Sequence, residues 1–391
     1  MTTDTKLAAR RGRLAVAAMF FANGFIIGSW APQIPLVLSR LGITETTLGL
    51  LILVFGLGAL VAMPWCGYLM ARHGSRAILR VFAVLSSFAL LLVALANNLW
   101  LIAPAMFFLG GVIGAMDVAM NTNAVVVEKR LGRAVMSSSH GFWSLGGFAG
   151  GASGGLIIQS VGHLPHAGMV TVVVFAIVAV AIGMLVEGER PAAQEHARFS
   201  WPSNPLVYLV GFMALFSMIP EGAVLDWAAL YLQQEMGSDI ATAGFAFAAF
   251  SATMAAMRFL GDGVRNRFGA VATLRVSALI AAAGMLVAGL APHAWLAIAA
   301  FAFSGLGIAN MVPIAFSAAG NQDGIESGTG MSVVTTMGYS GILVAPSAIG
   351  FLGERVGFAI IFVALSGLLV VVSLMAGLAR SADFVAHQPA E

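Results

Sequence analysis

The sequence predicts an all-α integral membrane protein with 12 transmembrane helices in two pseudo-symmetric six-helix bundles. Of its 391 residues, 60% are hydrophobic and only 9% are charged, whereas soluble domains carry roughly 25% charged residues. Each membrane crossing needs about 20 apolar residues, so the chain has room for about a dozen helices and for no sizeable soluble domain. An internal repeat, described below, relates the two halves.

The apolar segments follow one another in two groups of six. The first group lies in residues 1–186, the second in residues 205–391, and the polar segment 187–204 is expected to be a cytoplasmic linker. The basic start of the chain has the charge order of a signal peptide, but its apolar part exceeds a typical signal core, so we expect an uncleaved first helix. The predicted helices cover residues 14–38, 47–71, 77–97, 99–126, 136–160, 167–186, 205–232, 240–260, 271–291, 294–319, 328–352 and 357–379.

Basic residues predict the orientation. Of the 19 Lys and Arg residues, only Arg40 and Arg355 fall outside the chain start, the tail and the loops on the same side. Because basic loops stay in the cytoplasm, we expect both termini there and a bacterial inner-membrane location. The basic residues are scattered rather than gathered in a patch, which argues against a nucleic-acid partner. Cys66 is the only cysteine, so the chain cannot form an internal disulfide or a cysteine-based metal site.

A constant offset of 195 residues pairs many positions of the two halves without a gap. The pairs fall at loops and helix ends, and they include arginines in a protein poor in arginine. Two bundles repeated in the same orientation predict a pathway between them. The pairs are Gly42 and Gly237, Gly49 and Gly244, Arg72 and Arg267, Gly74 and Gly269, Arg80 and Arg275, Gly110 and Gly305, Met136 and Met331, Ser137 and Ser332, and Gly146 and Gly341.

The loop after the second helix reads GYLMARHGSRA and resembles the signature of the major facilitator superfamily. Ala71 stands where the signature has an acid, which puts the latch known in that family in doubt. In the second half, Arg258 and Asp262 are spaced i, i+4 and can supply an equivalent contact; alternatively, these charges only set the topology. The motif is matched by Gly67, Arg72, Gly74 and Arg76 in the first half and by Asn266, Arg267 and Gly269 in the second. The conformational-switch candidates are Gly67, Arg72, Gly74, Arg76, Arg258, Asp262, Arg267 and Gly269.

The fifth helix is rich in glycine. Two adjacent glycine stripes along it predict very close packing of neighbouring helices. The stripes are Gly146, Gly150 and Gly154, and Gly147, Gly151 and Gly155. The pattern also resembles the fifth-helix signature of antiporters in the superfamily, although Gly151 replaces its proline and Pro346 holds the equivalent place in the other half. Packing alone explains the stripes equally well.

Three further segments resemble a bacterial subgroup that includes the membrane protein MosC and permeases of the YbjJ type. They are DVAMNTNAVVVEKRLGR, MSSSHGFWSLGG and EGAVLDWAALYL, which begin at Asp117, Met136 and Glu221. The resemblance implies sugar-like or cyclitol-like substrates.

Three acids lie within predicted helices, where an ionisable group marks a functional site by default. Glu221 is placed roughly 5 Å from the membrane centre, Asp117 about 8 Å and Asp226 about 12 Å away. A carboxyl group in hydrocarbon binds a proton more readily than in water, so all three are proton-coupling candidates. Glu221 is the first choice because Pro220 can kink its helix. The alternative is a structural acid, and Glu221 and Asp226 point about 140° apart.

Polar and aromatic residues at similar depths are substrate-pathway candidates, although each can instead be an interhelical contact. No Lys or Arg is expected near the midplane, which argues against an organic anion as substrate. No cluster with metal-ligand spacing is found, and we expect no cofactor besides the proton as coupling ion. The pathway candidates are Asn23, Trp30, Asn121, His140, Trp143, Asn310 and Tyr339.

These features predict a secondary active transporter rather than an enzyme. We expect it to act as a monomer in the lipid bilayer and to move a small polar solute, neutral or amine-bearing, by alternating access coupled to protons. One alternative is efflux of lipophilic or cationic compounds by proton antiport, which the glycine motif and the 20 methionines favour. A non-transporting receptor or scaffold is a third possibility, but it requires a soluble signalling domain that the sequence does not contain.

Overall fold

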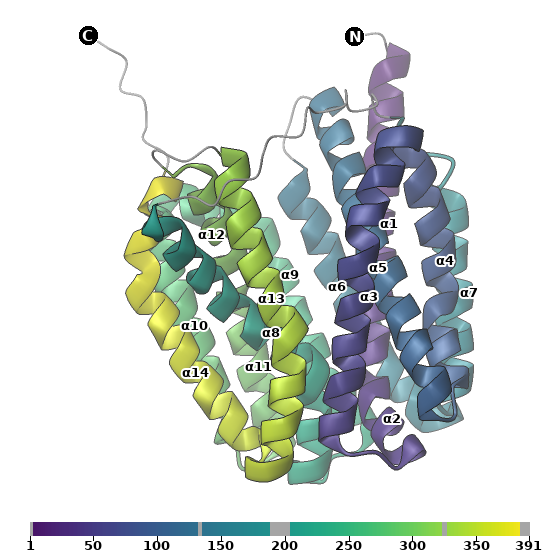
Figure 1. The fold of residues 1–391 in the computed structure, drawn as a ribbon, viewed down its shortest axis with the longest axis vertical. Helices are drawn as coiled ribbons and strands as arrows, with labels where there is room; N and C mark the ends of the chain where they lie inside the picture. Colours follow the sequence, from purple (N-terminus) through teal and green to yellow (C-terminus); the bar gives the residue numbers. More distant parts are fainter. Residues whose placement is uncertain (1–2, 132–134, 188–203, 323–326, 384–391) are drawn as a thin grey trace.

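A computed structural model describes residues 3–131, 135–187, 204–322 and 327–383, and their regular elements are all helices (Figure 1). Each of the twelve predicted segments corresponds to one helix or to consecutive helices. The elements are α1 Thr3–Trp30, η1 Ala31–Gln33, α2 Ile34–Leu41, α3 Glu45–His73, α4 Ser75–Leu95, α5 Leu99–Leu131, α6 Met136–Val161, α7 His163–Ala181, α8 Pro205–Met236, α9 Ile240–Phe268, α10 Ala270–Gly289, α11 Ala294–Ile308, α12 Met311–Gly320, α13 Ser327–Val356, α14 Phe358–Met375 and η2 Ala376–Ala382.

Eleven helical segments of the described chain are long and apolar enough to cross a membrane. The remaining long helix is α6, whose glycines, serines and histidine lower its hydropathy. With 26 residues it extends over about 39 Å, and it packs along α1 and α9. We count it as the twelfth transmembrane helix.

Two segments that the sequence predicts as continuous helices are interrupted. In the first, η1 separates α1 from α2, where Pro32 and Pro35 cannot donate backbone hydrogen bonds. In the tenth, α11 ends at Ile308 and α12 starts at Met311; Pro313 cannot donate to the carbonyl of Ala309, which lies in the break. By contrast, α8 continues through Pro220 as a single helix.

The repeat predicted from the sequence also appears in the backbone. The six described glycines with positive φ form three pairs, and the members of each pair are 195 residues apart. Each pair ends or begins corresponding helices in the two halves, at turns that glycine adopts without steric cost. The pairs are Gly42 and Gly237 (φ 59° and 64°), Gly74 and Gly269 (81° and 79°), and Gly162 and Gly357 (90° and 84°).

The helices pack in two groups. In residues 3–187, α1 packs on α6 and α3 on α5; in residues 204–383, α8 packs on α13 and α10 on α14. The main contacts between the halves are α6 with α9 and α3 with α13, which are corresponding pairs in the repeat. Helix α1 begins and η2 ends at the same end of the molecule (Figure 1), here named the terminal end; the opposite end is the far end.

The two glycine stripes of α6 face different neighbours. A Cβ added at Gly146, Gly150 or Gly154 would meet the segment from α1 to η1 of the same half. A Cβ added at Gly147, Gly151 or Gly155 would instead meet α9 of the other half. At Gly155, the added Cβ would lie 2.9 Å from the carbonyl oxygen of Ile240. Helix α6 is therefore held by close backbone contact both within its own half and across the interface.

The interface repeats the same contact twice. A Cβ at Gly49 of α3 would lie 2.9 Å from the carbonyl oxygen of Pro346 in α13, and one at Gly244 of α9 would lie 3.0 Å from that of Gly151 in α6. Gly151 and Pro346 are 195 residues apart, as are Gly49 and Gly244. The position at which Gly151 replaces the antiporter proline is therefore an interface position in both halves.

We expect Gly150→Ala to lower thermal stability, because the new methyl group would lie 2.7 Å from the backbone nitrogen of Ser29, and overpacking typically costs about 1–3 kcal/mol. Gly168→Ala in α7 is the matched control. It would meet nothing within 4 Å, and it should be neutral or stabilising by up to about 1 kcal/mol. Thermal unfolding of the purified protein in detergent measures both; equal shifts would contradict close packing at Gly150.

Candidate functional site

An ion pair between two helices of the second half lies at the centre of the molecule. Nη2 of Arg258 in α9 is 3.3 Å from Oε1 of Glu221 in α8, and the side chains are 14% and 23% exposed. Nη1 of Arg258 donates a hydrogen bond of 2.6 Å to Oγ of Ser144 in α6. The guanidinium group therefore joins an acid of its own half to a hydroxyl of the other half.

The place of Arg258 corrects one expectation. Its side chain contacts Glu221, Ser144 and Trp143, while the expected contact with Asp262 involves a side chain outside the described residues. The expectation that no basic group lies near the midplane is wrong. Side chains on a helix tilt toward its N-terminus, which for α9 is at the far end, so the long Arg258 side chain extends from the terminal-end part of α9 to Glu221, halfway along α8.

A chain of polar contacts continues from Arg258 into the first half. The guanidinium carbon lies 6.0 Å from the ring centroid of Trp143, within the range of a cation–π contact. Nε1 of Trp143 donates to Oδ1 of Asn23 at 2.9 Å, and Nδ2 of Asn23 donates to the carbonyl oxygen of Ile113 at 3.2 Å. Because Asn23 is only 1% exposed, these bonds fix the Trp143 ring against Arg258.

Asp117 of α5 is a second, partly buried acid. Nδ2 of Asn121, one turn along the same helix, donates to Oδ1 of Asp117 at 3.2 Å and to its carbonyl oxygen at 2.9 Å. Within the described ranges, the ion pairs are Arg258 with Glu221 and Arg76 with Glu187. Asp117 therefore has no basic side chain paired with it there.

Tyr339 of α13 lies near an acid of each half, Asp117 and Glu221. It is the repeat equivalent of Ser144, which contacts Arg258 across the interface. Tyr339 is 41% exposed, whereas Ser144 is fully buried. Asp117, Glu221 and Tyr339 thus bring polar groups of both halves close together.

The remaining pathway and proton-coupling candidates differ in their surroundings. His140 lies one turn before Ser144 on α6 and near Arg258; it is partly buried and its ring lies 5.1 Å from that of Phe20, edge to face. Trp30 is 2% exposed, Asn310 7% and Asp226 7%, so these three are packed in the protein interior. Asn310 lies in the break between α11 and α12, and its side chain packs against Gly261 of α9.

Ser144 is a site residue that sequence reasoning missed. It contacts Arg258, and its carbonyl oxygen also accepts a hydrogen bond of 2.8 Å from Ser251 of α9. The signal that points to it is its spacing of i, i+3 and i+7 with Gly147 and Gly151, which places Ser144 on the glycine stripe that faces the other half.

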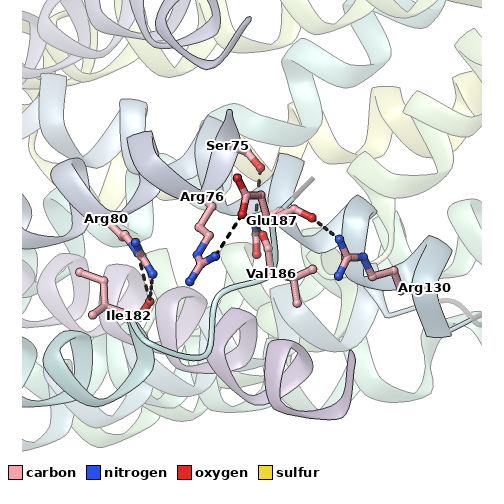
Figure 2. A network of polar contacts seen from close by, with 8 residues as sticks. Ser75, Arg76, Arg80, Arg130, Ile182, Val186 and Glu187 are labelled. Carbon is pink, nitrogen blue, oxygen red and sulfur yellow. Dashed lines mark hydrogen bonds and ion pairs between the residues drawn. The ribbon is translucent and has the colours of Figure 1, made fainter. Parts of the chain in front are cut away.

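The switch-loop residues of the first half bind within that half (Figure 2). Nη1 of Arg76 lies 3.3 Å from Oε2 of Glu187, and Arg80 donates two hydrogen bonds, of 3.2 and 3.1 Å, to the carbonyl oxygen of Ile182. Arg130 donates to the carbonyl oxygen of Glu187. These contacts fasten residues 182–187 to the first turns of α4 and to the last turn of α5.

The second half has a comparable arrangement at the same end. Arg265 donates to Oγ of Ser317 at 2.7 Å and to the carbonyl oxygen of Ala382, and Asp383 accepts a hydrogen bond from the backbone nitrogen of Ala270 at the start of α10. Among the other switch candidates, Arg72 stacks on Tyr68 and Arg267 on Phe268, each within its own half.

A small hollow lies between α8 and α13. Ordinary ligand pockets measure roughly 300–1,000 Å³, whereas this hollow has no room even for a water molecule. Apolar side chains and the Trp227 ring line it, so it is unsuited to a polar solute, and the Arg258–Glu221 pair remains the candidate site.

The sequence matches the model of a known membrane-protein family. The family model for the Major Facilitator Superfamily matches residues 16–231 and 208–389. The chain belongs to the major facilitator superfamily. It is therefore a multi-pass membrane transporter with a small-molecule substrate, and members of this superfamily are generally not enzymes.

Relatives in sequence and structure agree with this assignment. An uncharacterized MFS-type transporter of Yersinia pestis is 35% identical over 91% of this chain and 93% of that protein. Membrane protein MosC of Rhizobium meliloti is 32% identical over 91% and 88%, which confirms the predicted resemblance. Among solved structures, a D-xylose-proton symporter has a TM-score of 0.74 at 13% sequence identity, and the match covers 94% of this chain and 96% of that protein. A D323A mutant of nucleoside transporter NupG has a TM-score of 0.71 at 13% sequence identity, and the match covers 94% of this chain and 99% of that protein. The predicted fold class is thus confirmed.

We expect Arg258→Met to destabilise the protein by roughly 3 kcal/mol, because it leaves Glu221 as an unpaired, largely buried acid. Adding Glu221→Gln to Arg258→Met should restore much of that loss, since the remaining amide carries no charge. Thermal unfolding of the two single variants and the double variant forms a mutant cycle. Additive effects would show that the two side chains do not interact.

Proposed function

We propose that this transporter couples the movement of a small polar solute to protons at the Arg258–Glu221 pair. The observation that carries the proposal is the bridging position of Arg258, which binds Glu221 in its own half and Ser144 in the other. Alternating access requires the two halves to move relative to each other around a central site. A contact that joins the halves at that site couples its charge state to their arrangement.

Protonation of Glu221 would change this contact directly. A neutral carboxyl group no longer attracts the guanidinium, so Arg258 would reorient and its hydrogen bond to Ser144 would weaken. Movement of the halves would in turn alter the access of Glu221 to water on the two sides of the membrane. Asp117, which lies near Tyr339 as Glu221 does and has no basic partner among the described residues, is the second proton-coupling candidate.

The charged groups near Tyr339 favour a neutral or amine-bearing solute. Two acids, Asp117 and Glu221, lie near this residue, and Arg258 pairs with only one of them. An ammonium group on the solute would balance this excess of acidic groups, whereas a carboxylate would increase it. The positive charge of Arg258 would by itself favour an organic anion, but that charge is already matched by Glu221.

We also propose that the terminal end faces the cytoplasm and that the transporter resides in a bacterial inner membrane. Arg76, Arg80, Arg130 and Arg265 all lie near that end, in agreement with the preference of basic residues for the cytoplasmic side. At the far end, hydrogen bonds join the halves. In this conformation the central site is therefore closed toward the far end, which we assign to the outside.

The test is proton flux in proteoliposomes. We expect a sugar, cyclitol or amino-sugar panel to include a solute that changes the internal pH, as read by a trapped dye, and Glu221→Gln to abolish that change. Asp226→Asn is the matched control, since Asp226 is a buried acid of the same helix that lies away from Arg258, and it should retain flux if the protein folds. Flux that persists in Glu221→Gln would refute coupling at this residue.

The sign of the pH change separates the main proposal from its rival. Efflux of lipophilic cations by proton antiport uses the same acidic groups, and the resemblance of α6 to the antiporter motif favours it. An internal acidification driven by an inward gradient of a polar solute would indicate symport. A pH change of opposite sign, seen only with lipophilic cations, would establish antiport instead.

A further inference from the structure

Two side chains join the halves at the far end in the same way. Oε2 of Glu354 in α13 accepts hydrogen bonds from the backbone nitrogen of Thr46, at 3.1 Å, and from its hydroxyl, at 2.5 Å. Oε1 of Gln159 in α6 accepts one from the backbone nitrogen of Ala241 at 2.9 Å. Thr46 and Ala241 each lie in the first turn of the second helix of a half, α3 or α9.

These two contacts are equivalent under the internal repeat. Thr46 and Ala241 are 195 residues apart, and so are Gln159 and Glu354. In each case a side chain near the end of a fifth helix, α6 or α13, reaches the N-terminus of a second helix in the opposite half. The contacts are therefore reciprocal: each half caps a helix of the other.

Each of the two helices also has an N-cap of its own, which does not bind the N–H group that the opposite half binds. The first backbone N–H groups of a helix have no partner within the helix. Thr44 accepts a hydrogen bond from the nitrogen of Thr47, and Asp239 accepts one from that of Thr242. Each helix thus satisfies its third N–H group with its own N-cap, and the opposite half satisfies the second.

The two caps differ in charge. Glu354 is an acid, and negative charge is favoured at a helix N-terminus because the helix dipole places partial positive charge there. Gln159 provides a hydrogen bond without a charge. The cap on α3 should therefore hold the halves together more strongly than the cap on α9, although each cap accepts a hydrogen bond from the same backbone N–H position of its helix.

We infer that Gln159 and Glu354 are reciprocal cross-half helix caps that set the balance between the far-end-closed and far-end-open states, with the charged cap contributing more. When the far end opens, both side chains must leave the opposite half and water must replace them. Each cap therefore stabilises only the closed state, which is the property required of a gate residue. The inference rests on membership of the transporter family and not on the proposed solute or on proton coupling.

Spin-label distances test the inference in the full-length protein. Labels at Asn97 and Trp295, exposed far-end residues in opposite halves, report the separation at that end in a Cys66→Ala background. Glu354→Gln should shift the closed-to-open ratio toward open by about two- to fivefold. Gln159→Glu should shift it toward closed by a similar factor. Glu354→Gln combined with Gln159→Ala should shift it toward open by roughly tenfold.

Glu235→Gln is the matched control. Glu235 is also an acid at the far end, and it accepts hydrogen bonds from the backbone nitrogens of Phe358 and Ala359 at the start of α14, but it caps a helix of its own half. The variant should lower thermal stability without changing the ratio. If the variant lacking both caps gives the same distance distribution as Glu235→Gln, the inference is overturned. This readout needs no substrate, so it stands or falls separately from the flux experiment.

Discussion

The interface between the two halves is the constraint on which the rest of the structure depends. Within a bilayer, helices gain little from hydrophobic association and are held by close packing and interhelical hydrogen bonds. Helix α6 meets both requirements, since one glycine stripe lies against α1 and the other against α9. A helix with glycine on two faces has low hydropathy, which explains why α6 alone among the long described helices falls outside the eleven apolar candidates.

The repeat gives this interface its form, while differences between the halves give it function. Gly151 and Pro346 occupy equivalent interface positions, and the far-end caps are equivalent as well. The centre is not symmetric: Ser144 is buried against Arg258, whereas its equivalent Tyr339 is exposed. A symmetric scaffold therefore holds an asymmetric site, whose ion pair belongs to the second half.

The candidate site follows partly from the sequence. The sequence points to Glu221, Trp143, Asn23 and Asp117, because polar groups in hydrocarbon are costly and mark functional or structural contacts. Three of these four belong to the chain of contacts that includes Arg258. For Arg258 the sequence predicts a contact with Asp262, because the two residues are spaced i, i+4. Counting residues from the helix end gives the depth of the Arg258 Cα atom, but it does not give the depth of the guanidinium group at the end of the long side chain.

The sequence by itself determined the class of protein, the number of helices, the two-half organisation with its 195-residue offset, and the glycine stripes, because hydropathy, charge and spacing are local properties of the chain. Only the tertiary structure decided which residues meet, both within a half, as Arg258 and Glu221 do, and between the halves. The pairs between the halves are Arg258 with Ser144, Glu354 with Thr46, and Gln159 with Ala241. All four pairs, within and between the halves, are separated by 37 to 308 residues, and the rotation of each helix about its own axis selects them. That rotation is set by packing against neighbours, which no single segment of sequence specifies.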